Sequence, residues 1–181
     1  AEGFGAFAGL CLDEAKKLGW DAAGVEPSRW ASEHARSAYD ATVVNGTLDD
    51  VPWEPASFDV VTSFRGIWAT TPYAVSEMHR VLRPGGRAGI TVWGHVKASA
   101  GAWALAPFRL ATAEKVGSQA EMVSLGRPGA GEQLLASHGF TGIERVDVPF
   151  AMEFADPELY ARTLAATGPA LASTAQAGTA G

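Results

Sequence analysis

Two glycines and one acidic residue near the start of the chain have the types and spacing of a site for a ribose-containing ligand. Gly5 and Gly9 lie at the beginning of a segment with helical spacing, and Glu26 ends the short apolar run that follows. A glycine turn between a strand and a helix lets backbone N–H groups approach a ligand. An acid at the end of the next strand can accept hydrogen bonds from both ribose hydroxyls.

His95 is the candidate general base. It follows the apolar segment 87–94, at the predicted carboxyl end of a central strand, where open α/β sheets bind their ligands. An imidazole titrates near neutral pH and can accept a proton from a reacting group. The alternative is a loop histidine exposed to solvent. The other histidines are expected at helix surfaces, and no two histidines have metal-ligand spacing, so no metal is expected.

Three further residues are candidates for substrate binding. Arg65 follows the third predicted strand, where its guanidinium could hold a substrate carboxylate or phenolate; the alternative is an ion pair with a nearby acid. Trp68 and Trp93 could form the wall of a pocket for a flat, bulky acceptor, because ligand pockets are mostly apolar. Core packing is the alternative for each tryptophan.

The elements that must position these residues alternate along the first 95 residues. Apolar periodicity and glycine or proline punctuation predict helices over 10–18, 28–39 and 71–82, a tight turn over 83–86, and strands over 20–26, 41–46, 57–64 and 87–94. This order is typical of an α/β fold with a doubly wound, Rossmann-like, mostly parallel sheet.

The remaining chain departs from this alternation. Residues 96–128 have helical spacing without an obvious strand and are predicted to form a helical cap inserted into the core. Residues 129–155 return to the core with a helix over 129–140, ended by Gly139, and a strand over 143–150. Residues 156–181 form a helix capped by Asp156 and then a small-residue tail. We expect a further strand before Ala1 and further structure after Gly181.

Four segments in this order resemble the class I S-adenosylmethionine-dependent methyltransferases, especially the group that acts on small molecules. They are "GVEPS" (24–28), "GTLDDVPWEPASFDVVTS" (46–63), "EMHRVLRPGGRAGITVWG" (77–94) and, more loosely, "GAGEQLLASHGFTGIERVDVPF" (129–150). The resemblance covers most of residues 1–150. It implies S-adenosylmethionine as cofactor and methyl transfer to an oxygen, nitrogen or carbon atom of a small-molecule acceptor.

The resemblance also implies roles for individual residues near the cofactor. Glu26, with Pro27 beside it, would hold the ribose hydroxyls, and Gly5 and Gly9 would line the methionine end. The adenine edge would face Thr47 and Leu48, and the sulfonium would lie near Ser63 and Phe64. Phe7 stands where the family has its middle glycine. Its ring either narrows the pocket or turns outward with a shifted loop, for which Gly3 and Gly5 offer a second register.

Composition excludes several other classes of function. The net charge of -6 disfavours nucleic acid, which needs clustered Lys and Arg. The single cysteine permits no internal disulfide, and no apolar run approaches the length of a membrane span, so we expect a cytoplasmic protein without membrane contact. The sequence does not indicate the oligomeric state. Two other functions stay open: a methyltransferase-like protein without transfer activity, and a nicotinamide-dependent oxidoreductase, which shares the glycine-and-acid construction.

Overall fold

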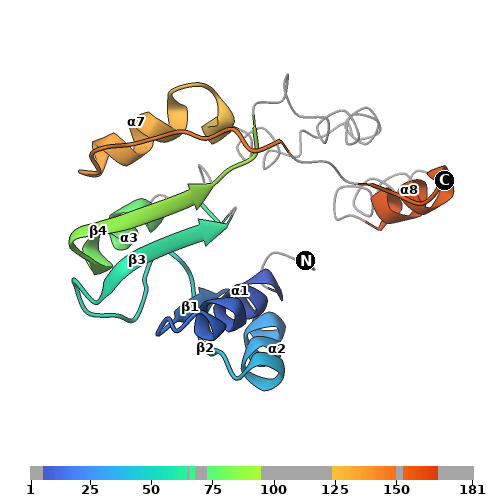
Figure 1. Cartoon of the computed structure of the whole chain (residues 1–181), viewed down its shortest axis with the longest axis horizontal. Helices are drawn as coiled ribbons and strands as arrows, with labels where there is room; N and C mark the ends of the chain where they lie inside the picture. Colours follow the sequence, from blue (N-terminus) through green and yellow to red (C-terminus); the bar gives the residue numbers. More distant parts are fainter. Residues whose placement is uncertain (1–5, 65, 68–72, 95–123, 150–152, 167–181) are drawn as a thin grey trace, which may run out of the picture. The chain divides into compact units, whose positions relative to one another are not determined.

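The computed structural model describes residues 6–64, 66–67, 73–94, 124–149 and 153–166 (Figure 1). The chain divides into two compact units. One consists of Ala1–Val92 with Leu134–Thr141, and the other of Trp93–Gln133 with Gly142–Gly181. No helix within the described ranges is both long enough and apolar enough to cross a bilayer.

The first unit begins with a helix and a pair of parallel strands. Helix α1 (Ala6–Lys17) is followed by β1 (Ala23–Glu26), α2 (Arg29–Tyr39) and β2 (Thr42–Asn45), and β1 pairs in parallel with β2 (Figure 1). Ser28 caps α2, because its hydroxyl accepts a hydrogen bond from the N–H of Ala31. Asp40 ends α2 in the left-handed conformation. The predicted helix over 28–39 and the two strands are therefore confirmed.

Close packing of α1 against α2 depends on Gly9. A Cβ atom at this position would lie 2.9 Å from Cδ2 of Tyr39 and 3.0 Å from Cβ of Ala35. Beneath the helices, Ala35, Ala41 and Val43 form a small buried cluster. The prediction that the first helix begins at Leu10 is wrong, since α1 begins at Ala6 and includes Gly9. The periodicity of the sequence does not reveal that α2 leaves no room for a side chain at Gly9.

A second parallel pair follows in the same unit. Strand β3 (Phe58–Phe64) pairs with β4 (Leu82–Thr91), and α3 (Ala74–Val81) connects them. Pairing shifts between Phe58↔Leu82 and Val60↔Arg87, so the predicted turn over 83–86 lies within β4 as an irregularity. Gly85 takes a positive φ of 81° there, which glycine adopts without strain. Helix α3 buries its apolar face through Val75, Met78 and Val81.

In the described residues after Gly94, the elements are η1 (Ser124–Gly126), α7 (Ala130–Ser137) and α8 (Pro157–Ala165). Gly139 follows α7 with a positive φ of 89°, as expected for the residue that ends a helix. Asp156 caps α8 by accepting the N–H of Leu159, with Pro157 in the first turn. Both helix predictions are confirmed.

The strand predicted over 143–150 is not formed by residues 143–149. Val146 and Val148 are each 77% exposed. A strand needs a neighbour to satisfy its backbone groups, and alternating apolar residues do not supply one. In the described part of the chain no strand pairs with this segment.

Parallel strands connected by helices confirm the α/β class. Within the described ranges the four strands pair as β1–β2 and β3–β4, two separate sheets of two strands each. The four-part domain division stays a prediction, and nearly all of the predicted cap lies outside the described residues.

Candidate functional site

Glu26 is a buried residue whose carboxylate has one of its two oxygens engaged in a hydrogen bond. The residue is 5% exposed, at the carboxyl end of β1. Its Oε1 atom accepts a hydrogen bond of 2.7 Å from the backbone N–H of Ser28. Among the described residues, no group donates to its Oε2 atom. This oxygen is not one of the fully buried polar atoms that lack a partner, so it keeps access to solvent and is free to accept a hydrogen bond from the hydroxyl group of a ligand.

Asn45 and Gly46 fix the backbone that carries this carboxylate. Glu26 and Asn45 are register partners at the ends of the two parallel strands. The Asn45 side-chain amide donates to the carbonyl oxygen of Glu26 at 2.9 Å and to that of Pro27 at 3.1 Å. The N–H of Gly46 donates to the Glu26 carbonyl at 3.2 Å. The turn after β1 is therefore attached to β2 at the position where Glu26 presents its side chain.

Leu48 and Ser63, both predicted to contact the cofactor, come together at Gly66. A Cβ atom on Gly66 would lie 2.9 Å from Oγ of Ser63 and 3.1 Å from Cδ1 of Leu48. Ser63 is 7% exposed, near the carboxyl end of β3. Gly66 thus allows the chain to pass close to both side chains, and a larger residue would displace one of them.

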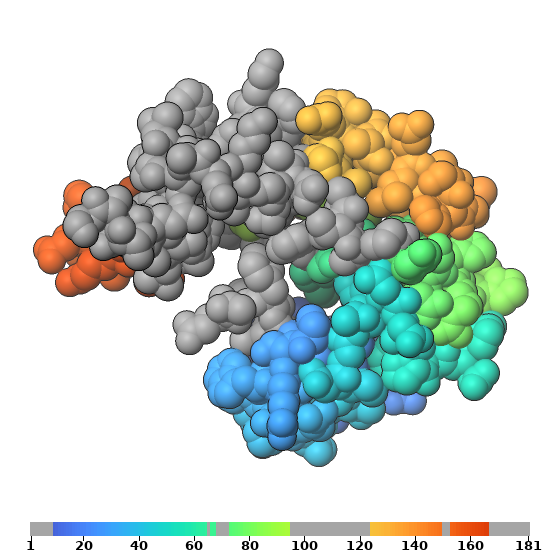
Figure 2. Space-filling model, turned by 180° about the vertical axis from the view of Figure 1, so that it is seen from behind, coloured from blue at the N-terminus to red at the C-terminus, as the bar shows by residue number. Residues whose placement is uncertain are grey.

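The other predicted cofactor residues are more exposed. Pro27, Thr47 and Phe64 are at the surface of the described chain. Phe7 and Gly9 both lie within α1, where Gly9 contacts α2. Leu10, the residue after Gly9, is exposed. Helix α2, against which Gly9 packs, forms part of the blue surface in Figure 2.

Several predicted residues cannot be placed. Gly5, Arg65, Trp68 and His95 lie outside the described residues. Trp93 follows β4, is half-buried and belongs to the second unit. The roles proposed for these residues stay predictions.

The remaining histidines have structural contacts. His34 on α2 stacks on Trp30, with ring centroids 5.3 Å apart. His79 on α3 meets Phe140 edge to face at 5.2 Å. The Nδ1 atom of His138 is 2.9 Å from the carbonyl oxygen of Leu134. His138 is half-buried, whereas the sequence predicted an exposed position.

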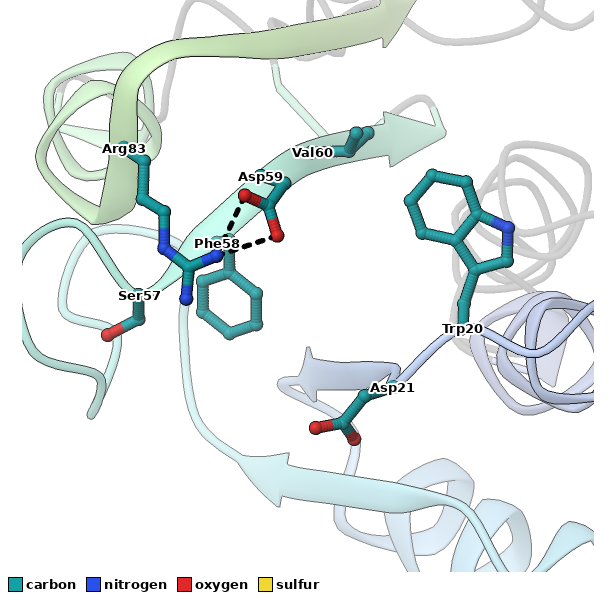
Figure 3. A pocket seen from close by; sticks show the side chains of 7 residues that line it. All are labelled: Trp20, Asp21, Ser57, Phe58, Asp59, Val60 and Arg83. Atoms are coloured by element: carbon teal, nitrogen blue, oxygen red, sulfur yellow. Dashed lines mark hydrogen bonds and ion pairs between the residues drawn. The ribbon is translucent and has the colours of Figure 1, made fainter.

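A cavity of about 160 Å³ lies apart from Glu26, along the beginning of β3 (Figure 3). Trp20 and Asp21 contribute to its wall from the segment before β1. Across from them, the Nη1 atom of Arg83 on β4 donates to both carboxylate oxygens of Asp59 on β3, at 2.7 and 2.8 Å. Arg83 is paired with Asp59, and Asp21 is a further acidic residue in the wall. Among the described residues, none of those predicted for the site lines this cavity. It offers no evident chemistry.

Sequence reasoning missed three positioning residues: Ser28, Asn45 and Gly66. Ser28 could have been suspected, since serine at the start of a predicted helix is a common cap residue. Asn45 acts through the register of two strands and Gly66 through a close approach in space. Neither relationship has a signal in the local sequence.

Comparison with known proteins agrees with this geometry. The family described as "Methyltransferase domain" matches residues 3–90. Among solved structures, the chain is similar to an S-adenosylmethionine-dependent methyltransferase of Thermotoga maritima, described as a possible histamine N-methyltransferase. The two share 20% sequence identity with a TM-score of 0.55, over 76% of this chain and 72% of the other. No curated protein matches significantly.

The structural match confirms the Rossmann-like class I fold, and the family match covers β1, β2, β3 and nearly all of β4. The candidate ribose-binding carboxylate, the loop after β2 and the end of β3 all lie within the matched residues. Methyl transfer is thereby favoured over hydride transfer, which the glycines and Glu26 alone left open. Residues 3–90 thus match the methyltransferase domain family, and the fold is similar to that of a methyltransferase whose methyl donor is S-adenosylmethionine.

Proposed function

We propose that this enzyme transfers the methyl group of S-adenosylmethionine to a small-molecule acceptor, and that Glu26 holds the ribose of the donor. The observation that carries the proposal is the buried carboxylate of Glu26, whose Oε2 atom has no donor among the described residues. A ribose hydroxyl would supply the missing hydrogen bond. The acidic net charge of -6 supports a small acceptor over a polyanionic one.

The donor is held in this proposal by three parts of the first unit. Glu26 accepts the ribose hydroxyls, while Ser28 and Asn45 keep its carboxylate and backbone in place. Thr47 and Leu48, directly after β2, face the adenine. Ser63, which is buried beside Leu48 at Gly66, lies toward the reacting end.

Bound S-adenosylmethionine supplies a methyl group on a sulfonium, from which it leaves readily. The protein then needs chiefly to hold the acceptor in line and exclude water, because positioning accounts for much of the acceleration of such a displacement. His95 is proposed to take the proton from an oxygen or nitrogen acceptor, which adds roughly 10²–10⁴-fold. Arg65, Trp68 and Trp93 are proposed to bind the acceptor.

Titration calorimetry with S-adenosylhomocysteine tests the donor site directly. We expect saturable binding to the full chain and no binding of NADH. Glu26→Ala should weaken binding by about 10- to 100-fold, since a charged acceptor of two hydroxyls is lost. Glu33→Ala is the matched control, because Glu33 is an exposed carboxylate on α2 that pairs with Arg29.

Wild-type protein that binds no S-adenosylhomocysteine would refute the proposed donor site, and equal affinity of the Glu26→Ala and Glu33→Ala variants would remove Glu26 from it. The acceptor class needs a separate assay with methyl-labelled donor. We expect label in small phenols, amines or activated carbon acids, and none in RNA or protein substrates. Label found in macromolecules alone would exclude a small acceptor.

A further inference from the structure

We infer that Glu77 and Arg80 of α3 are positioning residues that hold the loop after β2 in the shape that recognises adenine. This inference rests on the proposed function, because it assigns Thr47 and Leu48 to the adenine edge. Neither Glu77 nor Arg80 would touch the cofactor. They would act through the backbone of residues 51–53, which continue the chain from Leu48.

Arg80 binds the loop at two carbonyl groups. Its Nη1 atom donates to the carbonyl oxygen of Trp53 at 2.7 Å, and its Nη2 atom donates to that of Val51 at 3.1 Å. The backbone carbonyl of Arg80 also accepts the N–H of Ala56 at 3.0 Å. A planar guanidinium can serve both loop carbonyls at once, which a single ammonium group cannot reproduce with the same geometry.

Glu77 completes the attachment. Its carboxylate accepts two hydrogen bonds of 2.7 Å from Arg80, and its Oε2 atom also accepts the N–H of Val51 at 3.2 Å. The hydrogen bond from Arg80 is the main reason that the pKa of Glu77 lies below its usual value. Both backbone groups of Val51, a residue that is 8% exposed, are thus satisfied by side chains of α3.

A second contact joins the same loop to the beginning of α3. Asp49 accepts the backbone N–H of Tyr73 at 2.9 Å, and Tyr73 is the N-cap residue of this helix. Helix α3 is itself fixed by its buried face, in which Val75 is 1% exposed. Helix α3 therefore holds the loop at Asp49, before Val51, and at Trp53, after it.

This arrangement bears on specificity because adenine is read at its edge by short, directional contacts. Leu48 lies three residues before Val51, so a shift at Val51 moves the predicted adenine contact. Without Arg80 and Glu77, the buried backbone groups of Val51 would need other partners, and the loop would have to rearrange to find them. The ribose contact at Glu26 does not depend on these two side chains.

The test compares two ligands that differ at the base. S-inosylhomocysteine keeps the ribose and homocysteine parts of S-adenosylhomocysteine but carries an oxygen in place of the exocyclic amine. The ratio of their two affinities, measured by calorimetry on the full chain, reports recognition of the adenine edge. Hydrogen exchange at the amide of Val51 reports the attachment itself, independently of any ligand.

Arg80→Lys should lower the preference for the adenine ligand by about tenfold, with faster exchange at Val51. Glu77→Gln is a milder change and tests the same point if Arg80→Lys does not fold. We expect it to lower the preference and to speed exchange at Val51 to a smaller degree. Arg145→Lys is the matched control: Arg145 also donates to two backbone carbonyls, those of Arg127 and Gly126, and its side chain is 32% exposed against 33% for Arg80.

Each outcome decides the matter. A reduced preference in both loop variants, with the control unchanged, supports the positioning role. Equal weakening of both ligands, or an unchanged preference, overturns it while leaving the donor site intact. A wild-type chain that binds neither ligand refutes the proposed function and this inference together.

Discussion

Glu26 and Asn45 lie opposite each other at the ends of β1 and β2, and the side-chain amide of Asn45 donates to the backbone carbonyl of Glu26 at 2.9 Å. A second strand thereby fixes the peptide that carries the candidate ribose acceptor. This hydrogen bond joins Glu26, which would bind the cofactor, to Asn45, which would not.

The first prediction follows from this bond. Asn45→Ala should weaken S-adenosylhomocysteine binding about 3- to 10-fold and lower the free energy of unfolding by about 1 kcal/mol, since the Pro27 carbonyl loses its side-chain donor and the Glu26 carbonyl keeps only the N–H of Gly46. Asn45→Asp should be worse on both counts, because a carboxylate cannot donate and would face two carbonyl oxygens. Calorimetry and urea unfolding measure the two effects. An aspartate variant that binds as well as wild type would contradict this account.

Glu26→Gln should separate stability from binding. A neutral amide is less costly to bury than a carboxylate, and its oxygen can still accept the N–H of Ser28. We expect the unliganded variant to be as stable as wild type or more stable by about 1 kcal/mol, with binding at least tenfold weaker. Thermal unfolding with and without S-adenosylhomocysteine checks both. Loss of stability in the absence of ligand would show that the carboxylate serves the fold.

Two helical glycines should respond to alanine with opposite signs. At Gly9 the new methyl group would meet Tyr39 and Ala35, so Gly9→Ala should destabilise by about 1–3 kcal/mol despite better helix propensity. At Gly131 in α7 the nearest atom is the carbonyl oxygen of Leu125 at 3.4 Å. Gly131→Ala should therefore stabilise by up to about 1 kcal/mol. Urea unfolding of both variants is the measurement, and a stable Gly9→Ala protein would remove the proposed contact.

Acid should release part of the attachment between α3 and the loop. The pKa of Glu77 is lowered mainly by its hydrogen bond from Arg80, so its contribution to stability is present above the ordinary value of 4.5 and is lost as the pH falls through the lower folded value. Glu77→Gln should be less stable than wild type by about 1 kcal/mol at pH 7. The difference should shrink below pH 4.5, as urea unfolding at pH 7, 5 and 3.5 would measure. A constant difference across this range would contradict the assignment.

Local signals made several elements predictable. Ser28 and Asp156 are helix caps because a short polar side chain reaches an N–H three residues on, a relationship contained within one turn. Gly139 ends α7 for a similarly local reason. Glu26 at the end of an apolar run, after the glycines near the start of the chain, indicates the ribose site in the same way.

Long-range relationships were not predictable. The attachment of Asn45 to Glu26 spans 19 residues, and that of Arg80 to Trp53 spans 27. The sequence predicts a loop at Gly9, because it does not show that a second helix occupies the space beside this residue. The segment 143–149 has the alternation of a strand, but a strand also requires a partner, which its own sequence does not specify.

The hydrogen bond from Ser28 to Glu26 is donated by the main chain, and this has a consequence for sequence drift. Position 28 can exchange serine for threonine, asparagine or aspartate, all of which cap helices, while the amide beneath continues to serve the carboxylate. Proline is the substitution that deletes the donor outright. Related enzymes can therefore differ at this position without altering the pocket, provided that they avoid an imino acid there.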